Sequence, residues 1–233
     1  MVLSSKDRKP DGNRKTCVIG ESGSGKTVLL AQFPDLYICD FDNGLESLDA
    51  TGTEYHYDEY YDGAGEKPSA WQDFENIIQE WRKEPKHKTF VVDSFTRAVQ
   101  SCLRNVMANH GRGNPLPDIG HWGLIISTIQ RNLGYLSTLK CNVVINCHYQ
   151  MLKDDMTGEV YFLPSVYGKD LPQQVTTYFN NVWRTFVEAP KVETENPQYR
   201  LQVRPSGKYT TLKTTLPGKG LYFDIAKLNL KGE

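Results

Sequence analysis

Short apolar runs alternate along this chain with segments whose apolar residues recur at helical spacing. The apolar runs, rich in Val, Ile and Cys, lie at residues 16–19, 36–42, 88–94 and 142–147. Two amphipathic helices are expected between them, marked by Trp71, Phe74, Ile78 and Trp81 in the first and by Trp122, Ile125, Ile129, Leu133 and Leu136 in the second. Such alternation predicts an α/β fold, with a mostly parallel central sheet flanked by helices on both faces.

The remaining segments complete the expected organisation. Residues 1–14 are polar and charged and are expected to form an N-terminal arm, with a single domain over residues 15–233. Residues 98–109 are expected to be helical, and residues 51–67 and 149–167 to be loops. Ser69 and Gln72 have the spacing of a capping box at a helix start. Two β-like segments, at 182–187 and 199–203, predict a C-terminal β-rich extension, whose part from 189 to 233 is basic.

A phosphate-binding loop follows the first apolar run. Residues 20–27 satisfy the pattern G-x-x-x-x-G-K-T and consist of Gly20, Glu21, Ser22, Gly23, Ser24, Gly25, Lys26 and Thr27. Its glycines let backbone N–H groups converge on phosphate oxygens, Lys26 reaches the outer phosphates, and Thr27 offers a hydroxyl to Mg²⁺. The chain is therefore expected to bind ATP with Mg²⁺.

Carboxylates at two further strand ends supply what hydrolysis needs. Residues 90–93 read Phe-Val-Val-Asp, so a buried strand delivers Asp93 to the carboxyl edge of the sheet, where it could hold Mg²⁺. Asp40 and Asp42 end the preceding strand, and either could orient or deprotonate the attacking water. These positions predict an ATPase.

Composition indicates the size of the domain and the compartment of the protein rather than its activity. The 233 residues suit one α/β domain, and no apolar run approaches the roughly 20 residues that span a bilayer. Five cysteines without C-x-x-C spacing predict buried free thiols in a reducing compartment. We therefore expect a cytoplasmic protein without a membrane partner.

Charge is distributed unevenly, although the net charge is only −1. Residues 35–66 hold ten acidic residues and no Lys or Arg, whereas residues 198–233 hold seven Lys or Arg and two acidic residues. A polarised molecule of this kind could assemble head to tail or present one basic face, although solvated surfaces explain the distribution equally well.

The order of motifs resembles the RecA-like recombinase core rather than a small GTPase or a nucleotide kinase. The resemblance covers about residues 15–225 and rests on Cys-Asp-Phe-Asp at 39–42, Val-Val-Asp-Ser at 91–94, and the strand ending at residue 148. A core with little added is similar to phage-encoded single-strand annealing and recombination proteins. The resemblance implies that Asp42 stands where the family has its catalytic Glu, and His148 where it has a polar γ-phosphate sensor.

The same resemblance implies further functional residues. Residues 212–217 resemble the segment that sends a basic residue into a neighbouring subunit's ATP site, which assigns Lys213 to catalysis in trans. The two DNA-binding loops of the family correspond to the region before residue 124 and to residues 149–168. Candidate DNA contacts in these loops are Arg112, His121, Gln150 and Lys153.

The expected function is an ATP-dependent, single-stranded-DNA-binding recombinase or annealing protein with DNA-stimulated ATPase activity. Its expected partners are single-stranded DNA and further copies of the chain in a filament or ring, with a single-strand-binding protein as an additional candidate. Two alternatives remain open at this stage. One is a regulatory or loader ATPase of the same fold that acts on protein without binding DNA, and the other is a phosphotransferase acting on a small molecule.

Overall fold

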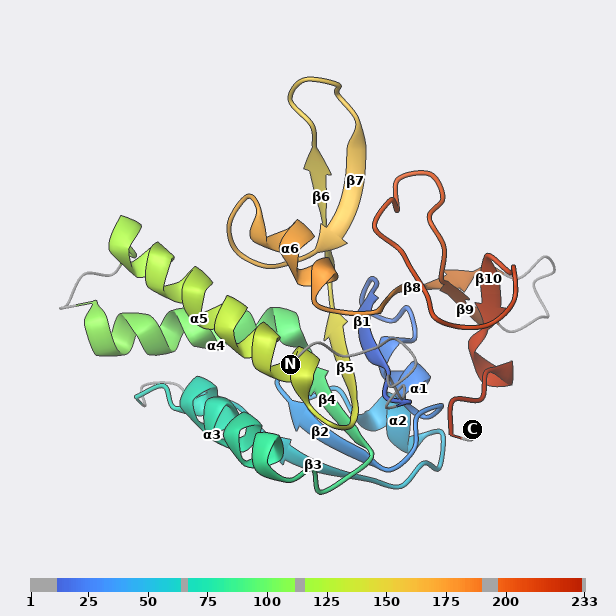
Figure 1. Ribbon diagram of the computed structural model, residues 1–233, viewed down its shortest axis with the longest axis horizontal. Coiled ribbons are helices and arrows are strands. Elements are labelled where there is room, and N and C mark those ends of the chain that lie inside the picture. The colour runs from blue at the N-terminus through green and yellow to red at the C-terminus, as the bar shows by residue number, and fades with distance from the viewer. Residues whose placement is uncertain (1–11, 64–66, 112–115, 190–196, 232–233) are drawn as a thin grey trace, which may run out of the picture.

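The computed structural model describes residues 12–63, 67–111, 116–189 and 197–231. Within these residues eight strands form one sheet, in the order β10-β9-β8-β1-β5-β4-β2-β3 (Figure 1). The strands are β1 (Lys15–Ile19), β2 (Leu36–Asp40), β3 (Tyr55–Glu59), β4 (Thr89–Asp93), β5 (Asn142–Cys147), β8 (Asn181–Glu188), β9 (Gln198–Gln202) and β10 (Tyr222–Asp224). Neighbouring strands from β8 to β3 are parallel, and β9 and β10 continue the sheet antiparallel.

Helices cover both faces of this sheet. They are α1 (Lys26–Leu30), α2 (Glu46–Asp49), α3 (Ala70–Lys83), α4 (Phe95–His110), α5 (Ile119–Thr138) and α6 (Leu171–Thr177), with a 3₁₀ turn at Ile225–Lys227. The larger core lies under α3, α4 and α5, and the smaller one lies under α1, α2 and the 3₁₀ turn. The predicted α/β architecture, with its mostly parallel sheet and C-terminal antiparallel strands, is confirmed.

The apolar strands contribute to both cores because successive side chains point to opposite faces. In β4, Phe90 and Val92 enter the larger core and Val91 enters the smaller one. Such strands read as continuous apolar runs, which explains why the sequence pattern located them. Their carboxyl ends, where Gly20, Asp93 and His148 follow, meet at one edge of the sheet.

Three local predictions are wrong. The segment 51–67 is not only loop, since Tyr55–Glu59 forms the edge strand β3 beside β2. Residues 149–167 include an antiparallel hairpin of β6 (Tyr149–Lys153) and β7 (Val160–Pro164), which projects from the body of the molecule (Figure 1). Ser69 precedes α3 but its side chain caps nothing; the Asp62 carboxylate instead accepts hydrogen bonds from the backbone N–H groups of Ser69 and Ala70.

The structure bears on the predictions about the cysteines and about membrane-spanning segments. All five cysteines are free and buried, as predicted. In the described residues, no helix combines the length and the apolar character needed to cross a bilayer.

Candidate nucleotide site

The phosphate loop is held against the sheet by close packing at its start. Gly20 follows β1, and its backbone N–H donates to the carbonyl of Cys147. The buried hydroxyls of Ser24 and Thr185 lie 2.7 Å apart, which ties the loop to β8. A Cβ atom at Gly20 would lie 2.4 Å from both hydroxyl oxygens, so only glycine fits there. The loop is therefore shaped before any phosphate binds.

Gly23 and Gly25 provide the turns that point loop N–H groups inward. Their φ angles are +73° and +90°, in the left-handed region that L side chains rarely adopt. A Cβ at Gly25 would also lie 2.7 Å from the ring of Tyr199, which extends from β9 over the end of the loop. Tyr199 thereby forms one wall of a cleft of about 550 Å³ in front of the loop.

Lys26 is buried at the first position of α1. Its Nζ donates to the carbonyls of Gly20 and Glu21 at 3.0 and 2.7 Å, so the ammonium lies at the centre of the loop. Burial lowers the pKa of Lys26, while the carboxylates of Asp93 and Asp42 act in the opposite direction. The ammonium is placed to neutralise phosphate charge in the cleft.

Thr27 and Asp93, the residues predicted to hold Mg²⁺, are in direct contact. The Thr27 hydroxyl donates to Asp93 Oδ2 at 2.8 Å, which joins α1 to the end of β4. Burial raises the pKa of Asp93 to about 6, and the hydrogen bond from Thr27 offsets part of this rise. Both groups are hard oxygen donors beside the phosphate loop, and Mg²⁺ binds through one or two carboxylates together with substrate phosphates. The residues present therefore fit Mg²⁺.

Asp40 and Asp42 have different roles although they lie two residues apart. Asp40 is buried, and its Oδ1 accepts from the backbone N–H groups of Asp42 and Asn43, so it holds the turn after β2. Asp42 instead lines the cleft. Its Oδ2 lies 3.5 Å from His148 Nε2, and its Oδ1 accepts from Arg97 Nε at 3.1 Å. Of the two candidates, Asp42 is the one that faces the nucleotide.

The environment of Asp42 keeps it ionised. Partial burial opposes ionisation, but hydrogen bonds from His148 and Ser94 and the charge of Arg97 outweigh it, so the pKa of Asp42 lies below its ordinary value. A carboxylate with a lowered pKa is a weak base, but it readily accepts a hydrogen bond from a water O–H group. This arrangement suits orienting a water rather than deprotonating it.

Three residues at or beside the cleft are not predicted from the sequence: Tyr199, which forms one wall, Arg97 and Asn146. Arg97 lies in the first turn of α4, directly after the strand that carries Asp93, and the only available signal was that position. Asn146 lies in register with Asp93 on the neighbouring strand β5 and is fully buried. Among the described residues, its amide meets no partner within strict hydrogen-bond geometry, but it lies close enough to Asp93 to lower the pKa of that carboxyl. Buried amides are normally paired, so a polar residue inside an otherwise apolar strand was the signal that could have found it.

Comparison with known proteins places this geometry in a family. A family model described as AAA domain matches residues 12–220, which is most of the chain. This chain belongs to the AAA domain family. It is thus an AAA-type P-loop ATPase domain, as its loop, metal ligands and cleft carboxylate indicate.

More distant similarity adds little to this assignment. Among curated proteins, no match to the chain is found. One solved structure with a similar chain path is a prototypical ATPase from the type III secretion system of pathogenic bacteria. It is 14% identical, with a TM-score of 0.46, over 74% of this chain and 52% of that chain. The AAA domain thus spans about half the length of that ATPase.

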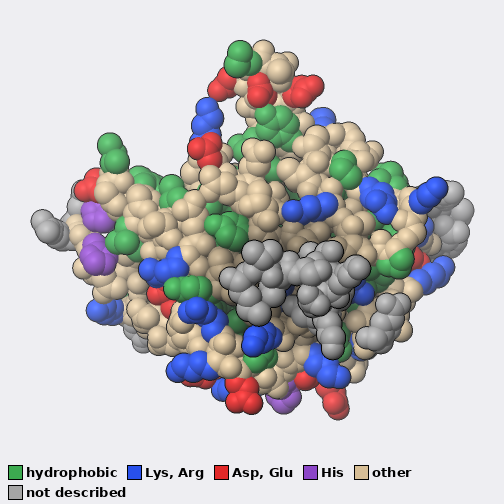
Figure 2. Space-filling view, viewed as in Figure 1, with side chains coloured by type: hydrophobic (Ala, Val, Ile, Leu, Met, Phe, Trp, Pro, Cys, Tyr) green, Lys and Arg blue, Asp and Glu red, His purple; other side chains and the backbone are tan. Residues whose placement is uncertain are grey.

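A projecting hairpin continues directly from the nucleotide cleft of the AAA domain. His148 separates β5 from β6, and its backbone N–H donates to the Thr96 hydroxyl. The next residue, Tyr149, donates its hydroxyl to the Glu21 carboxylate of the phosphate loop. Gln150 lies at the base of the hairpin and Lys153 near its tip. Figure 2 shows Asp and Glu side chains around that tip, which contains Asp154, Asp155 and Glu159.

The other predicted residues lie outside the cleft. Lys213 pairs with Val182 of β8 through its backbone, and its side chain is exposed, so a role in catalysis requires a second subunit. Arg112 lies outside the described residues. His121 helps to cap α5 together with Asp118, and its Nε2 lies 3.0 Å from the carbonyl of His110. These contacts explain His121 without DNA, and its contact with DNA stays a prediction.

Proposed function

We propose that this AAA domain is a Mg²⁺-dependent ATPase that binds single-stranded DNA in its ATP-loaded state and assembles with further copies of itself. Its task would be single-strand annealing or strand exchange in recombination. The observation that carries the proposal is the direct connection between cleft and hairpin. His148 contacts Asp42 in the cleft, and the chain passes from His148 straight into β6.

Each group in the cleft has a role in the proposed hydrolysis. The phosphate loop and Lys26 would hold the phosphates, and Thr27 and Asp93 would hold Mg²⁺, which supplies charge neutralisation and orientation of the phosphates. Asp42 would orient the attacking water, with Arg97 and His148 fixing its carboxylate. Asn146, buried beside Asp93, would help to keep that carboxylate ionised.

Two contacts can transmit the state of the cleft to the hairpin. His148 joins Asp42 to the first residue of β6, and Tyr149 joins that residue to Glu21 in the phosphate loop. A phosphate that competes for either contact would bias the position of the hairpin, which is how a ligand shifts a population between two states. In an assembly, Lys213 of a neighbouring copy would complete the site.

A second candidate function is favoured by the acidic hairpin tip. Asp155 and Glu159 are exposed there, and carboxylates repel a phosphate backbone. A regulatory or loader ATPase that acts on protein would use the same cleft and the same hairpin. It would form nucleotide-dependent assemblies without affinity for DNA.

Binding of labelled single-stranded DNA separates the two candidates. Fluorescence anisotropy is measured with Mg²⁺ and an ATP analogue, with Mg²⁺ and ADP, and without nucleotide. The recombinase proposal expects tighter, salt-sensitive binding with the ATP analogue, by about 5–150-fold as is usual for coupled sites. Lys26→Ala should lose this dependence. Assembly with nucleotide but without DNA binding at low salt would favour the loader instead.

A further inference from the structure

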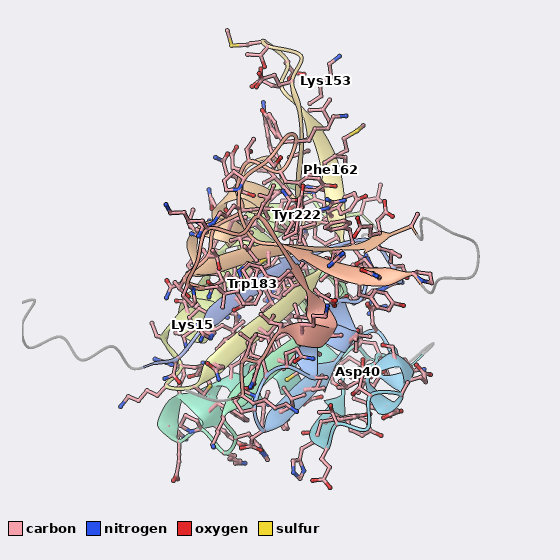
Figure 3. The ribbon with its side chains drawn as sticks, turned by 90° about the vertical axis from the view of Figure 1, so that its right-hand side faces the viewer. Lys15, Asp40, Lys153, Phe162, Trp183 and Tyr222 are labelled. Atoms are coloured by element: carbon pink, nitrogen blue, oxygen red, sulfur yellow. The ribbon has the colours of Figure 1, made fainter. Side chains whose placement is uncertain are left out.

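A second cleft, of about 780 Å³, lies at the edge of the sheet where β1, β2, β4 and β5 begin. We name it the amino-edge cleft. Its cationic lining residues are Arg14, Lys86, Lys88, Lys140 and Lys231. Figure 3 shows Lys15, at the start of β1, and Asp40, at the end of β2, on opposite sides of the molecule. Strands of five or six residues rise about 3.3 Å per residue, so roughly 16–20 Å separate this cleft from the nucleotide cleft.

Little negative charge balances these cations. Among the described residues that line the cleft, Asp35 is the one acid, and its carboxylate already accepts from His87 Nδ1 at 2.8 Å and from the backbone N–H of Lys88 at 3.0 Å. Lys86 pairs with Glu80 at 3.1 Å. Within the described part of the chain, the other four cations form no ion pair with a carboxylate: Arg14, Lys88, Lys140 and Lys231. The described residues that line the cleft therefore carry a net positive charge.

The backbone that presents two of these cations is held in place. The buried ammonium of Lys15 donates to the carbonyls of Leu139 and Cys141, each at 2.5 Å, and so holds both sides of Lys140. The backbone N–H of Arg14 donates to Asn142 Oδ1 at 2.8 Å. Lys15 adds a further positive charge just behind the surface. The charge pattern thus belongs to the folded sheet edge rather than to free chain ends.

We propose that the amino-edge cleft binds the phosphate backbone of a single-stranded nucleic acid. Its cations come from four separate segments of the chain, which favours a polyanion that can meet several segments over a single small anion. No Phe, Tyr or Trp occurs among its described lining residues, so its contacts reach phosphates rather than stacked bases. The inference rests on the proposed DNA-binding function and names a surface for it that the acidic hairpin tip does not provide.

The acidic hairpin of a second copy fits the cleft less well. Asp154 already accepts from the backbone N–H groups of Met156 and Thr157 and from the Tyr161 hydroxyl. Only Asp155 and Glu159 then remain at the tip to meet four unpaired cations. A phosphate backbone supplies one charge per nucleotide and can therefore meet cations from several segments of the chain.

The test measures binding of labelled oligothymidine across a series of salt concentrations, with the ATP analogue present. In the cleft variant, Lys88, Lys140 and Lys231 are changed to Gln; in the control variant, the equally exposed Lys169, Lys208 and Lys219 are changed to Gln. Three lost phosphate contacts should reduce the slope of log K against log[salt] by about 2. If the affinities are equal at 1 M salt, the cleft variant binds about 100-fold more weakly at 0.1 M. The control variant should change less than about twofold, and basal ATPase activity should persist in both.

Other outcomes overturn the inference in distinguishable ways. If the wild type binds and the cleft variant keeps its affinity and slope, the cleft is not the binding surface, although the proposed function stands. If only the control variant loses affinity, the DNA lies elsewhere on the molecule. If the wild type does not bind at low salt, the proposed function fails together with the inference. The remaining possibility is that the cleft binds the hairpin of a second copy. Sedimentation without DNA tests it: if the wild type is an oligomer and both the cleft variant and Glu159→Lys dissociate it, the cleft is an interface between copies and the inference is wrong.

Discussion

Substitution of Asp93 tests the electrostatics of the nucleotide cleft. Asp93 is 4% exposed at the end of β4, and burial raises its pKa from 3.8 to about 6. The pKa of Asp93 is thus higher in the folded than in the unfolded state. Protonation at low pH therefore stabilises the fold, and this contribution to stability is lost as pH rises through about 6. The free energy of unfolding falls by about 3 kcal/mol over the whole titration, and about 1.4 kcal/mol of this is lost between pH 5 and pH 8.

Asp93→Asn removes this pH dependence and keeps the shape of the side chain. Its amide oxygen can still accept from Thr27, and any cost of burying the NH₂ group is the same at every pH. We therefore expect the stability of the variant relative to wild type to improve by about 1.4 kcal/mol from pH 5 to pH 8. At the same time the variant should lose Mg²⁺-dependent ATP hydrolysis, because an amide does not replace the anionic ligand.

Urea unfolding without nucleotide, followed by circular dichroism at pH 5, 6, 7 and 8, measures the effect. Asp170→Asn, at an exposed carboxyl, is the matched control and should show no change of relative stability with pH. A relative stability of Asp93→Asn that stays constant over this range would refute the reasoning, because it would mean that the carboxyl pays no desolvation cost in the folded state. Thermal shift with Mg²⁺ and ATP gives an independent readout, since wild type should be stabilised and the variant should not.

Three further substitutions have clear expectations. Gly25→Ala should destabilise more than Gly23→Ala, since both pay about 1–3 kcal/mol for a positive φ but only at Gly25 would the new Cβ meet Tyr199; equal urea midpoints for the two variants would contradict this. Asn146→Leu should lower ATP turnover and raise the pKa of Asp93 further, because it removes an amide that lowers this pKa; an unchanged pH dependence of unfolding between pH 5 and pH 8 would exclude this role of the amide. Tyr149→Phe removes the donor to Glu21 and should weaken the dependence of DNA binding on the nucleotide while leaving basal hydrolysis near wild type; an unchanged dependence in anisotropy would exclude this contact from the coupling.

Contiguous motifs and buried strands were readable from the sequence. The phosphate loop needs eight consecutive residues, and its glycines are required by φ angles and close approaches within that short stretch. Asp93 was found because a fully buried strand is apolar throughout and ends at the edge where ligands bind. The alternation of such strands with amphipathic helices was enough to predict the layered α/β fold.

Features that depend on neighbours distant in sequence were missed or left open. The edge strand β3 has mostly exposed side chains, so it lacks the apolar pattern of the central strands. The sequence of the hairpin predicts a loop because its two strands form a separate small sheet and are short and half-exposed, so they lack the apolar pattern of buried strands. Asp40 and Asp42 could not be separated by spacing, because the turn after β2 directs one to the backbone and the other to the cleft.

By itself, the sequence determined that this protein is an α/β P-loop protein and which loop holds the phosphates, because both follow from local patterns of apolar and glycine residues. Only the tertiary structure decided that Arg97 and Tyr199 line the nucleotide cleft, that Asn146 lies beside Asp93, and that cations from four segments gather at the opposite edge of the sheet. It also placed Asp42, which the family resemblance singles out over Asp40, in the cleft. The reason is that strand register and helix placement bring together residues far apart in the chain, and no local pattern encodes those distances.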